Sequence, residues 1–429
     1  MSGSSFDFLL NLPRYDKRGA ASLKPGFDRI ERILSLAGNP HRAYTVAHIA
    51  GTNGKGSTSS MLAAIGTSSG LRVGLQTSPH LFDVTERMRI DGLPASHEWL
   101  DRTVSLLRRP LEKIGPSFFE AVTALSFIYF AEMNVDLAVV EVGLGGRLDA
   151  TNVVDPAVCA ISAIGIDHVA ILGDTVRAIA AEKAGIIKPG VPVVTSNDDP
   201  EIIDVLRSAA ENRNAPFETI ATHFPVASVE NGSGRTVLHL VSTRHDYGRV
   251  ELDLAGSHQV SNALLAVAAA EHLIPDPMPA VRTGLANTRR LSGLRGRLEV
   301  LRTRPMIVAD VGHNESGIAT ALAFARSECA GRLHVAIGLL RDKDCVAIAR
   351  RVAAVADFVH VIPLAGERAL EAERLVDVFR KEGAPVASVA DAQTVADAFV
   401  RTESTEDCLL LAGSHQVVAQ LDQNLLFST

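Results

Sequence analysis

The chain has 429 residues, of which 47% are hydrophobic and 21% are charged, and its formal net charge is −7. This length predicts more than one domain, the composition is that of a soluble globular protein, and the acidic balance argues against general nucleic-acid binding. The four cysteines are widely spaced without a Cys-x-x-Cys pair, which argues against a disulfide framework and a structural zinc site and favours the cytoplasm. Because the N-terminus has no basic region before an apolar core, and no 18-residue apolar span occurs, we expect no export signal and no membrane segment.

The first predicted elements are a short amphipathic helix over 27–36 and a strand over 44–50, which leads into the loop Gly-Thr-Asn-Gly-Lys-Gly-Ser (51–57). The three glycines of the loop let several backbone N–H groups approach one anion, and Lys55 adds a mobile positive charge. We therefore predict a phosphate site here, followed by a helix that opens at Ser57 or Thr58. The alternative is a glycine-rich turn with a solvated lysine, but the strand before the loop and the helix after it favour the phosphate site.

The middle of the chain alternates between two patterns. Apolar, β-branched runs predict strands, and the stretches between them read as helices, so we expect a parallel sheet covered by helices. The strands are expected at 73–76, 137–142, 157–166 and 191–195, and the helices at 57–70, 119–133 and 175–188. Residues 236–242 and 249–254 predict an antiparallel hairpin that extends the edge of this sheet.

A basic stretch over 289–304 holds six arginines and one carboxylate, and it separates two α/β patterns. The later pattern predicts strands at 306–311, 333–338, 358–362 and 409–412. The fold class is therefore α/β: an N-terminal P-loop ATPase domain with a mainly parallel sheet over 1–296, and a smaller, Rossmann-like α/β domain over 297–429. Ligands of open α/β sheets bind beyond the carboxyl ends of the strands, so we expect the active site in a cleft between these domains.

Several polar residues follow predicted strands. Glu141 ends a buried strand and suits Mg²⁺ opposite the Lys55 loop, although a strand-end glutamate can also be simply solvated. His168 follows another strand and is either a metal ligand or a surface histidine. Lys183 taken alone reads as a solvated helix lysine.

Two further groups follow strands of the second domain. The run Asp-Val-Gly-His-Asn-Glu (310–315) offers a carboxylate, an imidazole and an amide, although Asn314 or Ser316 could instead be a helix N-cap. The run Gly-Ser-His-Gln (413–416) follows a strand in the same way, with the same ambiguity.

Taken together, nine motifs resemble those of the folylpolyglutamate synthases, including the bacterial bifunctional dihydrofolate synthase form, of the Mur ligase superfamily. Their order and spacing fit nearly the whole chain. The motifs are residues 51–57, Thr-Ser-Pro-His at 77–80, Phe-Phe-Glu at 118–120, the glycine-rich run 141–152, Asp-His at 167–168, Glu-Lys-Ala-Gly-Ile at 182–186, 258–263, Gly-Arg at 296–297, and 310–314.

The resemblance implies an ATP-dependent ligase. ATP would phosphorylate the carboxylate of a folate or of dihydropteroate, and the amine of L-glutamate would attack the resulting acyl phosphate. The cofactors implied are two Mg²⁺ ions, with ATP as co-substrate and K⁺ as a further candidate. The partners are these small molecules, with no nucleic acid and no membrane, and the chain is expected to be a cytoplasmic monomer.

The resemblance also implies roles for individual residues. Lys183 matches the family's carbamylated lysine and would act in catalysis with His313 and Ser414, which would lie toward the incoming glutamate. Ser78 and Glu141 would hold the first Mg²⁺, and His168 the second. The predicted ATP contacts are Thr52, Asn53, Gly54, Lys55, Gly56, Ser57, Asn262, Arg297 and Asp310. The predicted folate contacts are Phe119, Glu120, Asp149 and Ala150.

The sequence departs from the family pattern at three places. Glu315 stands where the family usually has proline, 413–416 matches loosely, and Tyr15–Lys24 does not read like the bifunctional enzymes. Three alternatives therefore stay open: a synthase that only extends polyglutamate, a Mur-type ligase with another carboxylate acceptor, and a nucleotide-binding switch without ligase activity.

Overall fold

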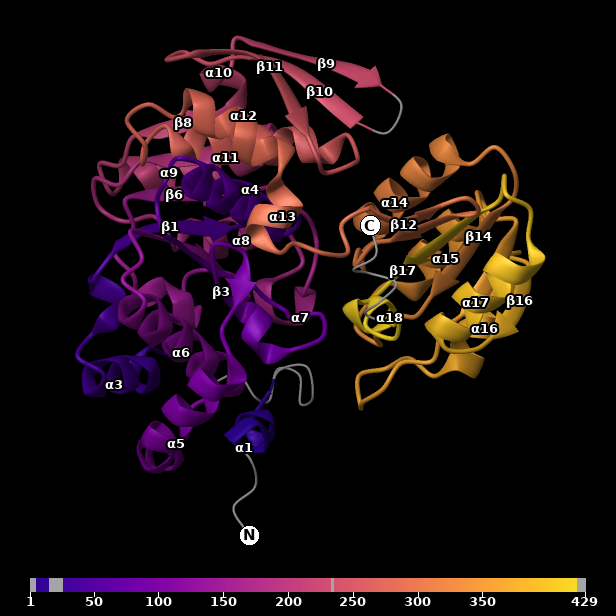
Figure 1. The fold of residues 1–429 in the computed structure, drawn as a ribbon, viewed down its shortest axis with the longest axis horizontal. Coiled ribbons are helices and arrows are strands. Elements are labelled where there is room, and N and C mark those ends of the chain that lie inside the picture. Colours follow the sequence, from indigo (N-terminus) through magenta and orange to yellow (C-terminus); the bar gives the residue numbers. More distant parts are fainter. Residues whose placement is uncertain (1–4, 15–25, 233–234, 423–429) are drawn as a thin grey trace. The chain divides into compact units, whose positions relative to one another are not determined.

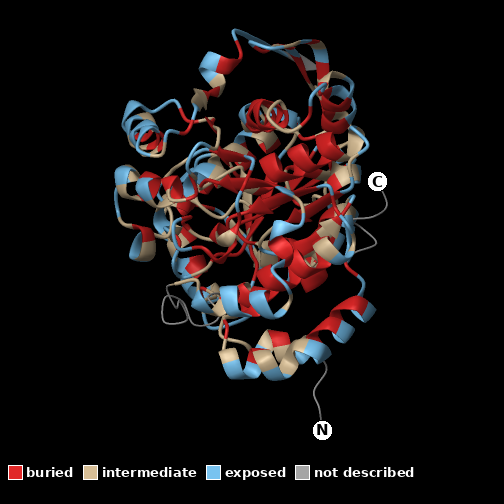
Figure 2. Cartoon of the chain, turned by 90° about the vertical axis from the view of Figure 1, so that its left-hand side faces the viewer, coloured by how far each residue is buried: buried red, intermediate tan, exposed pale blue. Residues whose placement is uncertain are grey.

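The structure is a computed structural model that describes residues 5–14, 26–232 and 235–422. The predicted divergent segment Tyr15–Lys24 lies outside the described residues. The contacts divide the chain into two units, which are named unit 1 (Met1–Asp253 with Ser257–Leu294) and unit 2 (Leu254–Gly256 with Arg295–Thr429). Each unit has its own hydrophobic core, and Figure 2 shows buried strands and helices at the centre of unit 1.

Unit 1 contains an eight-stranded sheet of order β4-β3-β2-β5-β1-β6-β7-β8. Along the sheet, the neighbouring strands in the run β2-β5-β1-β6-β7-β8 are all parallel. The strands β3 and β4 complete one edge and pair antiparallel. This confirms the predicted, mainly parallel sheet. The strands are β1 (Thr45–Ala50), β2 (Val73–Gln76), β3 (Met88–Ile90), β4 (Leu93–Pro94), β5 (Leu137–Glu141), β6 (Val158–Ile161), β7 (Val193–Thr195) and β8 (Phe217–Thr219).

Helices cover both faces of this sheet (Figure 1). Successive residues of β2 face opposite sides, because Val73 lies against Gly66 of α4 whereas Gly74 lies against Phe130 of α6. The α4 side holds α4 (Lys55–Ser68), α11 (His258–Ala270), α12 (Met278–Ala286) and α13 (Thr288–Ser292). The α6 side holds α1 (Ser5–Asn11), α3 (Asp28–Leu36), α5 (His97–Ile114) and α6 (Phe118–Glu132). The other helices of unit 1 are α7 (Val169–Leu172), α8 (Val176–Ala184), α9 (Pro200–Glu211), α10 (Ile220–His223), and the 3₁₀ turns η2 (Pro40–Arg42), η3 (Val84–Arg87) and η4 (Ala150–Val153).

A separate antiparallel sheet corrects the prediction that a hairpin extends the main sheet. The strands β9 (Val226–Gly232), β10 (Arg235–Val241) and β11 (Asp246–Leu252) form a three-stranded sheet of their own. Its apolar residues Leu238, Leu240 and Val250 are buried, and β11 packs against α12. The hairpin therefore buries its apolar face on a helix and does not pair with β8.

Unit 2 contains a six-stranded sheet of order β12-β13-β17-β14-β15-β16, in which only the edge strand β12 is antiparallel. This agrees with the predicted smaller α/β fold. The strands are β12 (Glu299–Thr303), β13 (Met306–Ala309), β14 (Leu333–Ile337), β15 (Phe358–Val361), β16 (Val386–Val389) and β17 (Cys408–Ala412). The helices are α14 (Glu315–Glu328), α15 (Cys345–Ala353), α16 (Ala372–Lys381), α17 (Ala392–Thr402) and α18 (His415–Val418).

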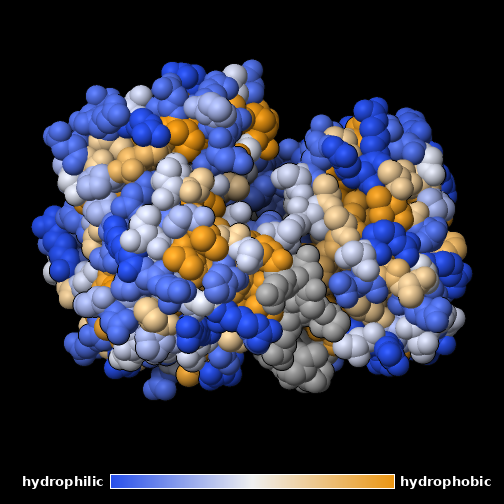
Figure 3. Space-filling view, turned by 90° about the horizontal axis from the view of Figure 1, so that it is seen from above, coloured by the Kyte–Doolittle hydropathy of each residue, from blue (hydrophilic) through white to orange (hydrophobic). Residues whose placement is uncertain are grey.

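On the face that Figure 3 shows, most of the surface is polar. In the view of Figure 3, hydrophilic residues dominate and apolar residues form small, separate patches. Among the helices of the described residues, none has the length and apolar character needed to cross a membrane.

Candidate active site

The predicted phosphate loop joins the carboxyl end of β1 to the amino end of α4. The helix begins at Lys55, two or three residues earlier than predicted, and its N-cap Gly54 has φ +89°. The first α-helical bond runs from Thr58 N to the Gly54 carbonyl, so the amides of Lys55, Gly56 and Ser57 precede that bond. Such amides at a helix N-terminus are the groups that bind phosphate.

Two lysines converge on one carbonyl of this loop. Lys55 Nζ donates to Gly51 O and Thr52 O, each at 3.1 Å, and Lys183 Nζ donates to Gly51 O at 2.7 Å. Lys183 is only 3% exposed, so the reading of a solvated helix lysine is wrong. Burial, together with the charge of Lys55, lowers the pKa of Lys183 from 10.5 to about 7.

The predicted first metal pair is held together at the ends of two neighbouring strands. Glu141 is the last residue of β5 and is buried, and its Oε2 accepts from Ser78 N at 2.9 Å just beyond β2. Glu141 is therefore not a simply solvated glutamate, and an oxygen-rich group lies at this edge of the sheet.

The segment before His168 differs from the prediction. The strand expected over 157–166 ends at Ile161, and residues 162–165 turn toward the phosphate loop, where Ala163 O accepts from Thr52 N and Asn53 N at 2.9 and 3.1 Å. Backbone groups committed to that loop cannot also continue the sheet. His168 lies seven residues beyond the strand, with φ +52°, as the N-cap of α7, and its ring faces Asp167 at 3.9 Å.

The predicted folate residues lie at two places. Phe119 and Glu120 are in the first turn of α6, and Asp149 and Ala150 are at the end of the glycine-rich run. The ring of Phe119 lies against Gly143, where a Cβ would overlap it. Glu120 closes the capping box of α6 through Ser117 N and Oγ, both at 2.7 Å, and pairs with Arg29 at 3.0 Å. Its carboxylate therefore has structural partners in addition to the predicted ligand.

Asp149 and Ala150 lie at η4. The buried Asp149 carboxylate accepts from Leu144 N at 2.8 Å, Thr151 N at 3.0 Å and Thr151 Oγ1 at 2.6 Å, and burial raises its pKa. Ala150, the first residue of η4, is also buried.

Asn262 is the one predicted ATP contact on α11. It is buried, and its side chain packs so closely on Gly54 that a Cβ there would collide with Oδ1. Gln259, one turn earlier, accepts from Asn262 Nδ2 at 2.9 Å and holds the amide in place. The structure thus brings Asn262 to the phosphate loop from a helix more than 200 residues away in sequence.

The other predicted residues belong to unit 2. Asp310, just beyond β13, accepts from Gly312 N at 2.7 Å and Leu298 N at 2.9 Å, which places it beside the backbone that follows Arg297. The ring centroids of His313 and His415 are 6.1 Å apart. Arg297 is half-buried, and Ser414 is buried and caps α18. Asn314 is the N-cap of α14, so that alternative is confirmed for its side chain.

The sequence did not predict two arginines that lie around the Phe118 ring, at the start of α6 in unit 1. The guanidinium groups of Arg14 and Arg87 lie 4.5 and 5.2 Å from the centroid of the Phe118 ring, and Arg87 Nε donates to His80 Nδ1 at 2.8 Å. Phe118 and His80 lie within quoted motifs, but nothing in the sequence pairs them with the two arginines.

A further group of potential metal ligands occurs in unit 2. His334, Glu403 and Asp407 offer ligand atoms within 4.8 Å of one another. Arg332 already donates to Glu403 at 2.7 Å and to Asp407 at 3.0 Å, so an arginine supplies the positive charge there.

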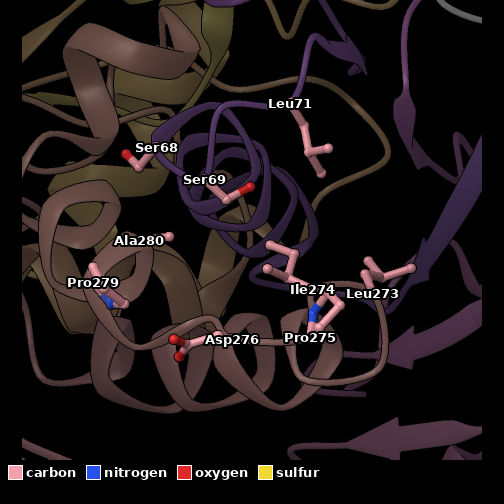
Figure 4. Close-up of a pocket in the computed structure, with 9 residues that line it drawn as sticks. All are labelled: Ser68, Ser69, Leu71, Leu273, Ile274, Pro275, Asp276, Pro279 and Ala280. Atoms are coloured by element: carbon pink, nitrogen blue, oxygen red, sulfur yellow. The ribbon is translucent and has the colours of Figure 1, made fainter.

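A cavity of about 410 Å³ lies at the carboxyl end of α4, at the opposite end of that helix from the phosphate loop (Figure 4). Its position separates it from the predicted active site. Its lining residues are Ser68, Ser69, Leu71, Leu273, Ile274, Pro275, Asp276, Pro279 and Ala280.

Both units of this chain are similar to known protein families. The Mur ligase middle domain matches residues 49–270, and the Mur ligase, glutamate ligase domain matches residues 296–415. The chain is 34% identical over 368 residues to a dihydrofolate synthase/folylpolyglutamate synthase of Bacillus subtilis, covering 83% of this chain and 85% of that protein.

Two solved structures are similar over nearly the whole chain. A Mycobacterium tuberculosis folylpolyglutamate synthase complexed with ADP and AMPPCP has 32% identity and a TM-score of 0.83, covering 94% of this chain and 96% of that chain. Escherichia coli FolC in complex with DHPP and ADP has 26% identity and a TM-score of 0.84, covering 97% of this chain and 96% of that chain.

Proposed function

Since the chain belongs to the Mur ligase family, among its folylpolyglutamate and dihydrofolate synthases, and is an ATP-dependent ligase, we propose that it joins L-glutamate to tetrahydrofolates and to dihydropteroate. A carboxylate does not form an amide unaided, because its oxygen is a poor leaving group. Transfer of the γ-phosphoryl group of ATP to that oxygen gives an acyl phosphate and ADP. The amine of glutamate then attacks the carbonyl carbon, and phosphate leaves.

The observation that carries this proposal is the pair of lysines at the phosphate loop. Lys55 is the first residue of α4, and its Nζ donates to a carbonyl of the phosphate loop, which supports the proposal that it serves the phosphates of ATP together with the amides at the start of the helix. Lys183 lies buried at the same carbonyl with a pKa of about 7, so much of it is a neutral amine near neutral pH. A neutral amine can add CO₂ to form a carbamate, which is the role we propose for it.

The residues at the strand ends fit a magnesium ion. Glu141 and Ser78 offer a carboxylate and a hydroxyl, which are oxygen donors of the type Mg²⁺ prefers, and the bond from Ser78 N keeps them adjacent. For a second Mg²⁺ we propose His168, with oxygen donors added by a carbamate on Lys183. Bound Mg²⁺ would neutralise phosphate charge. A K⁺ requirement, the cytoplasmic location and the monomeric state stay predictions.

The remaining site residues are proposed from the family motifs that they match. We propose that Phe119, Glu120, Asp149 and Ala150 contact the folate, with the Phe119 ring available for stacking. In unit 2 we propose that Arg297 and Asp310 serve the nucleotide, and that His313 and Ser414 serve the incoming glutamate. The arginine can neutralise charge on a transferring phosphoryl group.

The test is a product assay. The purified chain is incubated with ATP, Mg²⁺, K⁺ and glutamate, with either tetrahydrofolate or dihydropteroate, and the products are read by mass spectrometry. We expect one added glutamate on dihydropteroate and one or more on tetrahydrofolate. Addition to tetrahydrofolate alone restricts the chain to polyglutamylation, and no product with either acceptor contradicts the proposal.

A further inference from the structure

Residues 162–165 connect the phosphate loop to the proposed metal ligand His168. Ala163 O accepts from two amides of the phosphate loop, those of Thr52 and Asn53. Ser162 Oγ donates to Asn53 O at 2.8 Å, and Thr52 Oγ1 exchanges bonds of 3.1 and 3.2 Å with the carbonyl and amide of Gly165. This segment therefore fixes one side of the phosphate loop, and His168 follows three residues after it.

A single buried amide holds this segment from its other side. Asn197 lies just beyond β7 and is 7% exposed. Its Oδ1 accepts from Ile164 N at 2.8 Å, and its Nδ2 donates to Ser162 O at 3.0 Å. These two bonds bracket Ala163, the residue whose carbonyl receives both amides of the phosphate loop.

The orientation of this amide is fixed by a neighbour. Thr195 Oγ1 donates its proton to Ile161 O at 2.9 Å, so towards Asn197 Nδ2, at 2.7 Å, the hydroxyl acts as an acceptor. An NH₂ group therefore points toward Ser162 O, and the carbonyl oxygen points toward Ile164 N. Asparagine satisfies both partners at once, whereas aspartate would place an anion against a carbonyl oxygen.

We propose that Asn197 is a positioning residue of the ligase reaction. Its amide sets the path of residues 162–165, and through them it sets the phosphate loop and the start of the Asp167-His168 pair. The inference rests on the proposed function in one respect, which is that the phosphate loop holds ATP and His168 serves the metal. Asn197 itself touches neither the loop nor the reacting groups in any bond that the described structure shows.

The experiment compares Asn197→Asp with a matched control. Ser126→Ala changes a buried polar group elsewhere in unit 1, a hydroxyl that donates to Val122 O within α6, on the other face of the sheet. The readouts are kcat, the KM for ATP and for the folate acceptor, the Mg²⁺ concentration for half-maximal rate, and ADP affinity by calorimetry.

For Asn197→Asp we expect the KM for ATP to rise and kcat/KM for ATP to fall by about 10- to 100-fold, because small misplacements of positioned groups cost that much. ADP affinity should fall and the half-saturating Mg²⁺ concentration should rise, while the KM for the folate acceptor stays within about twofold of the wild-type value. In the control, all KM values should stay unchanged. An unchanged ATP KM in Asn197→Asp, or equal changes for both substrates, overturns the proposal.

Two measures keep the test decisive. If Asn197→Asp does not fold, Thr195→Val leaves Asn197 in place but removes the acceptor that orients its amide, and it should change the ATP KM in the same direction. If the wild-type chain forms no glutamylated product, the proposed function fails, whereas ADP calorimetry still tests Asn197. Unchanged ADP affinity in both variants overturns the inference on its own.

Discussion

At the residue scale, Lys183 shows how burial lowers the pKa of an otherwise ordinary lysine. It is in the last turn of α8, and its ammonium group loses hydration beside the charge of Lys55. In the proposed carbamylation, the neutral amine nitrogen would bond to the carbon of CO₂ and one proton would leave, so that an anionic carbamate would stand where the ammonium cation stood. The sequence could not reveal this burial, because it depends on the carbonyl of Gly51, 132 residues earlier.

We therefore predict that bicarbonate controls the activity below neutral pH. Below a pKa of about 7 the amine becomes protonated and cannot add CO₂, so activity should fall as the pH drops from 8 to 6. Added bicarbonate at fixed pH should restore part of it. Initial rates, and a ¹³C NMR carbamate signal after loading with ¹³C-bicarbonate, measure the effect.

The control for this prediction is Lys183→Met, which keeps an unbranched side chain of nearly the same length but removes the amine. It should lack the carbamate signal and should lose at least about a hundredfold in kcat, as expected when an electrostatic group at a reacting centre is removed. Near-normal turnover of the variant would show that Lys183 has no catalytic role.

A second residue-scale feature is a series of hydrogen bonds that ends at Asp149, one of the proposed folate contacts. Thr151 Oγ1 donates to Asp149 Oδ1 at 2.6 Å, so it accepts from His48 Nε2 at 2.8 Å. His48 is fully buried, which lowers its pKa to about 3 and keeps it neutral. The imidazole of His48 is therefore in the tautomer that carries its proton on Nε2, and the series of hydrogen bonds ends at the Asp149 carboxylate.

This series of hydrogen bonds predicts that two substitutions of Thr151 have different effects. Thr151→Val leaves Asp149 and His48 each short of one partner, so we expect a loss of about 1–3 kcal/mol of stability and a higher KM for the folate acceptor. Thr151→Ser keeps the hydroxyl and should resemble the wild-type chain. Urea unfolding measures the effect on stability, and steady-state kinetics measures the effect on KM. Equal stability and equal KM values in the two variants would contradict the proposed direction of these hydrogen bonds.

At the element scale, the regular core was predictable and the irregular parts were not. Short β-branched runs between turn residues predict β2 completely and predict the central residues of β1, β5 and β7. The helical stretches between these runs predict α4 and α6. The strand over 157–166 was overestimated because β6 and the loop after it are both apolar. The site residues themselves stay predictions, although the structure places Lys55, Lys183 and Asn262 at one loop.

A group of charged side chains connects the three-stranded sheet to the rest of unit 1. His223 at the end of α10 contacts Glu218 at 2.7 Å and Glu271 at 2.9 Å, and Tyr247 of β11 donates to Glu271 at 2.8 Å. These contacts raise the pKa of His223 against the effect of burial, and they lower the pKa of Glu271. An ion pair therefore ties α10, α11 and β11 together.

The sign of these pKa shifts predicts how these charged side chains respond to pH. The raised pKa of His223 gives a stabilisation that is complete below about pH 6.5 and is lost as the pH rises through the folded-state pKa. The lowered pKa of Glu271 gives one that is present above about pH 4.5 and is lost as the pH falls. Hydrogen exchange of the β10 and β11 amides, corrected for the intrinsic rate, should therefore show less protection at pH 8 than at pH 6.

Glu271→Gln should weaken that protection by about 3 kcal/mol and reduce the difference between pH 6 and pH 8, because it breaks a buried ion pair while Glu218 still contacts His223. The matched control is Glu251→Gln on β11, whose partner Arg249 is exposed, and it should cost less than about 1 kcal/mol. Protection that does not change with pH in the wild-type chain would contradict a charged His223.

At the scale of the whole molecule, the two units have separate cores. The clusters around β1, β5 and α6 and around β6 and α8 belong to unit 1, and the cluster around β14 and β17 belongs to unit 2. A bound nucleotide stabilises only the folded unit that contacts it. The response of each unit to ADP is therefore a direct test of which residues serve the nucleotide.

We predict two calorimetric transitions, of which that of unit 1 rises with Mg²⁺ and ADP. At 100 times the dissociation constant the stabilisation is about 2.7 kcal/mol, which corresponds to several degrees for a unit of this size. Lys55→Ala should abolish the shift. If Arg297 contacts the nucleotide as proposed, the transition of unit 2 should also rise, and Arg297→Ala should remove that second shift while leaving the first. A rise confined to unit 1 in the wild-type chain would remove Arg297 from the nucleotide site, and no rise at all would remove the phosphate loop.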